Sequence, residues 1–241
     1  MAEQTNSASL DKAIDALNTY EWGTDIAALE PIDKAIQEAF GKPAARKELE
    51  SRLAPVLKSG APRAAKDFVC RKLALVGSAQ SVPALAELLA NEELSHMARY
   101  ALERIPGPEA DRALRDALPR IQGKRKVGVL DTLGVRKDSG STARLAALVN
   151  ATDAEVAAAA ARALGQIGNS EAAKALEAYR KGAPTEFQNV AAAACLRCAE
   201  RLVESGKRDE AVAMLRPLAA QEQPANVRLA AKRALSVATR A

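Results

Sequence analysis

The sequence predicts an all-α fold, a right-handed helical solenoid closed at its first end by a helical cap. Composition is the first reason, because 55 Ala and 27 Leu make up about a third of the 241 residues while aromatic residues contribute only 3%. Small side chains let helix backbones approach closely, whereas sheets favour β-branched and aromatic residues. The second and third reasons are an internal repeat and its helix–turn–helix form, described next.

One stretch, 164–176, aligns without a gap with three earlier stretches at 73–85, 102–114 and 133–145. A helical run begins eight residues before each opening leucine, and the same frame identifies two later runs. Taken as position 0 of this common frame, the starts are Ala65, Leu94, Arg125, Val156, Phe187 and Val227, separated by 29, 31, 31, 31 and 40 residues. Such a period predicts stacked pairs of helices.

Small or helix-breaking residues separate the two helices of a unit, as at Gly77–Ser78, Pro106–Gly107–Pro108 and Gly168–Asn169. We therefore expect residues 62–241 to form about six helix pairs, the last one incomplete. Residues 1–61 are expected to form the cap, because an open stack must cover its first apolar face. Three apolar stripes at helical spacing support the cap: Leu10, Ile14 and Leu17; Ile26, Leu29, Ile32, Ile36 and Phe40; Leu49, Leu53, Val56 and Leu57.

The clearest unit contains Thr152-Asp-Ala-Glu-Val156, a run of alanines, and then Arg162-Ala-Leu-Gly-Gln-Ile-Gly168. This pattern resembles the short bacterial HEAT-like repeat, also called the phycobilisome-lyase-type repeat, over roughly residues 62–241. The resemblance implies an armadillo-like superhelix in which the outward side of the second helix of each pair lines a concave surface. The first sixty residues resemble those that head some environmental-bacterial HEAT-repeat proteins, whose relatives often carry an export signal and further domains.

A helical wheel assigns the faces of these helices. At 100° per residue, positions 0, +4, +8 and +11 form the buried stripe, and positions +2, +3 and +6 lie opposite. Aromatic, Met and Arg side chains carry most binding energy at interfaces. The outward positions give the candidate partner-binding residues Phe68, Arg71, His96, Met97, Tyr100, Asp131, Arg162, Asn189 and Arg233. The large side chains among the first five predict a contact site. The alternative is that these side chains cover the exposed edge of the stack beneath the N-terminal helices.

The cysteines and the single histidine favour no catalytic or metal site. Cys195 and Cys198 form a C-x-x-C pair, but they occupy the buried positions +8 and +11, and Cys70 lies on the same side. Free cysteines are commonly small core residues, and zinc would need two further soft ligands. Because no His-Glu dipeptide occurs, the sequence excludes the helical-repeat hydroxylases that bind iron through several such dipeptides. We expect no cofactor and no metal.

The predicted function is a non-catalytic scaffold that binds a protein or peptide in the concave groove. The formal net charge of +5 is modest for a nucleic-acid binder. A helical-repeat DNA glycosylase would use Tyr100 and Asp131 with Arg71, Arg162 and Arg233, and this is the less favoured alternative because the central groove positions are Ala and Gly. The other alternative is the repeat segment of a larger exported enzyme or cytochrome.

No stretch reaches the roughly 18 to 20 apolar residues that span a bilayer, so we expect no membrane insertion. The first residues lack the basic and apolar regions of a signal peptide, which predicts a cytoplasmic protein. If Met1 replaces a removed signal, the protein is periplasmic or exported. The sequence specifies neither the partner nor the oligomeric state.

Overall fold

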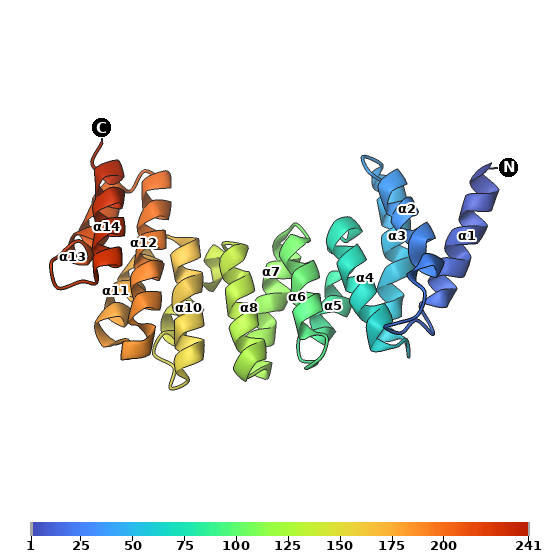
Figure 1. The fold of residues 1–241 in the computed structure, drawn as a ribbon, viewed down its shortest axis with the longest axis horizontal. Helices are drawn as coiled ribbons and strands as arrows, with labels where there is room; N and C mark the ends of the chain where they lie inside the picture. The colour runs from blue at the N-terminus through green and yellow to red at the C-terminus, as the bar shows by residue number, and fades with distance from the viewer. Residues whose placement is uncertain (1, 241) are drawn as a thin grey trace. The chain divides into compact units, whose positions relative to one another are not determined.

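The computed structural model describes residues 2–240, and this part of the chain forms helices and connecting turns without strands (Figure 1). The predicted all-α fold class is therefore confirmed. Met1, on which the alternative of a removed export signal depends, lies outside the described residues. The chain divides into two compact units, one that ends at Ile121 and one that begins at Gln122, and each is described by itself.

The first unit holds the N-terminal helices and the first two repeated pairs. Its elements are α1 (Ala2–Ala16), η1 (Ile26–Leu29), α2 (Glu30–Glu38), α3 (Pro43–Leu53), η2 (Ala54–Lys58), α4 (Arg63–Val76), α5 (Val82–Leu88), α6 (Ser95–Arg104), α7 (Pro108–Ala117) and η3 (Leu118–Arg120).

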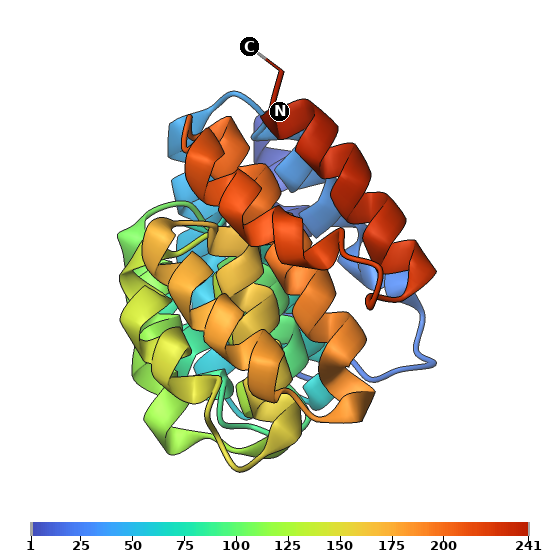
Figure 2. The same ribbon diagram turned by 90° about the vertical axis from the view of Figure 1, so that its left-hand side faces the viewer.

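The second unit continues the alternation of helices and ends with the long pair α12 and α13 and the last helix α14, the end seen in Figure 2. Its elements are α8 (Gly123–Val135), η4 (Ser139–Ser141), α9 (Thr142–Leu148), α10 (Ala154–Ile167), α11 (Ser170–Gly182), η5 (Thr185–Phe187), α12 (Gln188–Glu204), α13 (Arg208–Leu218) and α14 (Ala225–Ala238).

The recurring starts predicted from the sequence all fall within two residues of a helix start, or inside its first turn. We call α4, α6, α8, α10, α12 and α14 the frame helices, since each carries position 0 of the frame or follows it directly. In the best-defined unit, capping residues fix both ends of α10. The Asp153 carboxylate accepts hydrogen bonds from the backbone amides of Glu155 and Val156, and Gly168, with φ of 64°, ends the helix. Asn169 then caps α11.

Most of the predicted buried stripe is confirmed in this unit. Val156, Ala160 and Leu164 are buried in α10, whereas Ile167 at its end is half-buried, and all three cysteines are buried in their helices. As the composition predicts, the small side chains in this stripe allow neighbouring helices to pack closely.

Glycines bring the frame helices of the second unit into close contact. A Cβ placed on Gly134 of α8 would lie 2.7 Å from the Cα of Ala163, and one on Gly165 of α10 would lie 2.7 Å from the backbone oxygen of Ala194. Helices α8, α10 and α12 therefore lie side by side at a separation that only a missing side chain permits (Figure 1).

The N-terminal helices bury most of their three predicted stripes, and Leu17, Leu29, Ile32 and Leu53 are fully inaccessible. Ile26 and Phe40 of the second stripe are exceptions, because they are 56% and 90% exposed. For Phe40 the reason is local: α2 ends at Glu38, and the chain turns at Gly41 with φ of 73°, which points residue 40 away from the helix face. The boundary of the cap at residue 61 stays a prediction.

Candidate functional site

Position +6 is the outward position of the frame helices. Its occupants are exposed in five of the six helices and half-buried in the sixth; in chain order they are Arg71, Tyr100, Asp131, Arg162, Ala193 and Arg233. The first two belong to the first unit, and the other four belong to the second. Because the predicted site residues divide in this way, each unit presents its own candidate surface.

Phe68, predicted to be exposed in the groove, is buried, with 4% of its surface accessible. Its ring packs against Tyr20 at a centroid distance of 6.2 Å, and the Lys72 ammonium lies 4.4 Å from the ring centroid. The prediction that Phe68 is exposed on the groove side is therefore wrong. The segment after α1 covers this side of α4, which a wheel of α4 alone does not show.

Positions +2 and +3 were also expected to face outward, and in the second unit several do not. Gly128, Ala158 and Ala159 are buried. The neighbouring frame helices approach so closely at Gly134 and Gly165 that they cover these positions from the side. The face left open to a partner is therefore narrower than the wheel predicts.

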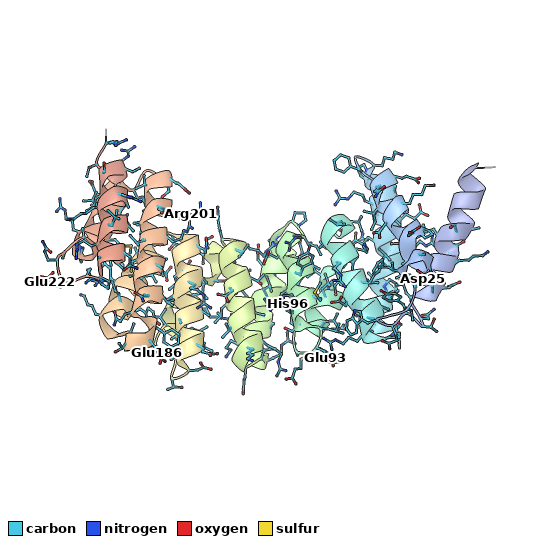
Figure 3. All side chains as sticks on the ribbon, viewed as in Figure 1. Asp25, Glu93, His96, Glu186, Arg201 and Glu222 are labelled. Atoms are coloured by element: carbon cyan, nitrogen blue, oxygen red, sulfur yellow. The ribbon has the colours of Figure 1, made fainter. Side chains whose placement is uncertain are left out.

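The remaining predicted residues of the first unit lie on α4 and α6, two helices in contact. His96 is exposed on α6 (Figure 3), Met97 is half-buried, and 36% of Tyr100 is accessible. Tyr100 already has a partner on its own helix, since the Arg104 guanidinium lies 3.7 Å from its ring centroid. Arg71 forms an ion pair with Asp67 one turn earlier.

In the second unit the structure brings three predicted residues together. Arg162 of α10 binds Asp131 of α8 through both of its carboxylate oxygens, with Nε–Oδ1 and Nη2–Oδ2 distances of 3.0 and 3.1 Å. Arg162 and Asn189 then line one hollow of about 410 Å³ between α10 and α12. We call it the first hollow, and its other lining residues are Gln166, Val190, Ala193, Ala194 and Arg197.

Arg233 is not part of this group. It lines a separate hollow of about 500 Å³, the second hollow, on the other side of α12. Alanine and larger aliphatic side chains form its floor, namely Ala199, Val203, Leu215, Ala230, Ala234 and Val237, and Glu200 and Glu204 of α12 stand with Arg233 as its charged groups.

The exposed stripe of α12 separates the two hollows. An ion pair across it, 2.9 Å from the Arg197 Nη1 to the Glu200 Oε2, joins the first hollow to the second. A second pair, Arg201 with Glu204 at 2.6 Å, follows one turn later. We call this stripe with its two flanking hollows the α12 surface.

Most residues of the α12 surface were not predicted. The sequence did contain one signal, because residues 189, 193, 197, 200 and 204 recur at helical spacing along a single side of the long helix. The outward positions +2, +3 and +6 lie near the start of each frame helix. They do not reach the second half of α12, a helix that is longer than the other frame helices.

The buried cysteines have no reactive setting. Burial raises the pKa of the Cys70, Cys195 and Cys198 thiols from 9.0 to about 12 in each case. A thiol that stays protonated is a poor nucleophile and a poor metal ligand. Among the described residues, no group of three or more His, Cys, Asp or Glu side chains is placed to hold a metal ion.

Comparisons with known proteins identify the repeat. Residues 124–195 match the family model for HEAT repeats. Among solved structures, an archaeal HEAT-like repeats protein from Thermococcus onnurineus NA1 is similar, with 13% identity, a TM-score of 0.53, and 97% of this chain and 96% of that chain covered. This likeness shows the fold, and the family match over residues 124–195 confirms the HEAT-like repeats expected from the sequence.

Two further structures are similar at lower TM-scores. Human deoxyhypusine hydroxylase in complex with glycerol has 16% identity and a TM-score of 0.38, with 98% of each chain covered. An engineered protein has 22% identity and a TM-score of 0.33, with 95% of this chain and 96% of that chain covered. No curated protein matches the sequence. None of the helices described between residues 2 and 240 is long and apolar enough to cross a membrane.

Proposed function

We propose that the protein is a non-catalytic scaffold that binds a protein or peptide partner through the α12 surface of its second unit. One observation carries the proposal: the exposed stripe of α12 is flanked by two hollows, of about 410 and 500 Å³, whose walls are largely rigid helix. Hollows of this size accept several side chains, and a preformed surface costs little ordering on binding.

The charges on this surface favour a protein partner over nucleic acid. Arg162 and Arg197 are the two basic groups in the first hollow, and each is paired with a carboxylate, of Asp131 and Glu200 respectively. Binding of a phosphate backbone depends on unpaired Lys and Arg side chains that release counterions. The paired arginines instead provide fixed hydrogen-bonding groups beside apolar walls, which is typical of protein interfaces.

The repeat type that we propose is the short bacterial one, which the 31-residue spacing and the segment 162–168 resemble. The alternative of a repeat segment within a larger exported enzyme or cytochrome is compatible with the same surface. In that case the partner would be another domain of the longer protein.

Affinity capture with mass spectrometry tests the proposal. The bait is the full chain, compared with Ala193→Trp, which fills the first hollow at an exposed position, and with Ala178→Trp, which adds the same side chain to an exposed position of α11. We expect a partner that both wild type and Ala178→Trp retain and that Ala193→Trp loses at least tenfold, about 1.4 kcal/mol. Equal capture by all three baits would contradict the proposal, provided that circular dichroism shows the variants folded.

A further inference from the structure

The second hollow lies beside two frame helices, α12 and α14, that lack the glycine contact found between α8, α10 and α12. In the frame, position +9 is glycine in α8 and α10, at Gly134 and Gly165, and each glycine receives the alanine at position +7 of the next frame helix. In α12 position +9 is Leu196, so this helix has no glycine there to receive a neighbouring backbone. Helix α14 packs less closely on α12 than α12 does on α10.

The resulting space has the dimensions of a helix-binding groove. Its α14 wall runs from Ala230 to Val237, two helical turns or about 10 Å. Side chains at i and i+4 of a bound helix lie about 6 Å apart, so two of them fit along this wall. The floor suits apolar side chains, because Val203, Leu215 and Val237 supply methyl groups and the alanines leave space.

The charged side chains around the groove differ in whether they form an ion pair. The Glu200 and Glu204 carboxylates have cationic partners on α12 itself, at Arg197 and Arg201. Arg233 on the opposite wall has no ion pair with any residue between 8 and 240, the part of the chain whose side chains the structure describes. The charge of the groove that a ligand can neutralise is therefore positive, and an anionic group fits it best.

We propose that the second hollow binds an amphipathic helix of a protein partner, which inserts two apolar side chains one turn apart and sets an Asp or Glu carboxylate against Arg233. The proposal rests on the scaffold function above and names the chemistry of its partner. Helices commonly bind grooves between helices through apolar anchors at i and i+4, while charges at the rim fix their orientation.

Selection from a random peptide library displayed on phage, with the full chain as target, tests this proposal. Selected peptides are synthesised and titrated against the wild type and against two groove variants, Arg233→Glu and Ala230→Trp. Their matched controls are Lys232→Glu, a charge reversal on the neighbouring exposed residue, and Ala225→Trp, at the exposed start of α14. We expect helical peptides with apolar residues at i and i+4 and nearby acids, with Kd raised at least tenfold by each groove variant and less than twofold by each control.

Two results of the selection would overturn the proposal: peptides that bind all variants equally, or peptides with basic rather than acidic residues beside the anchors. Self-association in sedimentation velocity that Ala230→Trp abolishes would also overturn it, because the occupant would then be a second copy of the chain. The scaffold proposal fails separately, because it is judged by the Ala193→Trp capture. If Ala193→Trp loses its partner but the selected peptides bind the groove variants as well as the wild type, the scaffold proposal holds and the helix-binding proposal fails.

Discussion

At the scale of the residue, the Phe68 side chain shows how strongly a neighbour outside the repeat decides exposure. Its ring lies between Tyr20 and the Lys72 ammonium, and only 4% of its surface is accessible. The Phe68→Ala variant should therefore lower the free energy of unfolding by about 3 to 5 kcal/mol, because it leaves a cavity in a packed region. Urea denaturation followed by circular dichroism measures this, with Arg71→Ala, exposed on the same helix, as control. A change of less than 1 kcal/mol would mean that the ring is not buried in solution.

The buried thiols give the protein a pH dependence with a definite sign. Burial raises the pKa of Cys195 and Cys198 from 9.0 to about 12, so the folded state keeps protons that the unfolded state releases above pH 9. The free energy of unfolding is therefore unaffected by these groups below pH 9 and falls as the pH rises from 9 towards 12.

Denaturation midpoints at pH 8 and pH 10 measure that fall. The Cys195→Ala/Cys198→Ala variant is expected to be less stable at both values, because it loses buried volume, but to lose less on going to pH 10 than the wild type does. An equal loss in the two proteins would show that the thiols are not buried.

At the scale of the element, a single glycine sets the separation of two frame helices. Because a Cβ on Gly165 would lie 2.7 Å from the backbone oxygen of Ala194, Gly165→Ala should lower the free energy of unfolding by about 1 to 3 kcal/mol despite the better helix propensity of alanine. Gly182, at the end of α11, has nothing within 4 Å of the same atom, and Gly182→Ala should be neutral or stabilising by up to about 1 kcal/mol. Thermal denaturation distinguishes the two, and equal midpoints would refute the close packing.

The element scale is also where the sequence was most informative. The aliphatic residues at the frame positions predicted where the frame helices lie and which side of each is buried. This was possible because a 3.6-residue period and capping residues such as Asp153 act within one helix. The burial of Ala159 and Phe68 could not be predicted from the period of a single helix. It depends on how closely the next helix, or the segment around Tyr20, approaches, and that is a property of packing between elements.

At the scale of the whole molecule, the candidate residues belong to two compact units, and their chemistry differs. In the first unit Arg71 and Tyr100 are occupied by contacts with Asp67 and Arg104 on their own helices. In the second unit Arg162 and Asn189 line a hollow, and Arg233 lines another. The sequence identified these three residues by their place in the frame. It could not show that α12 lies between two hollows, since their volume depends on the spacing of α10, α12 and α14.

The central claim is that a partner binds the α12 surface, and hydroxyl-radical footprinting of the full chain with and without the captured partner tests it most directly. Oxidation of exposed aliphatic side chains reports which surface the partner covers. We predict protection of Val190, Val203 and Val237, which line the two hollows, and unchanged oxidation of Leu75, an exposed residue of the first unit. Protection of Leu75 with no change at the three valines would contradict the account.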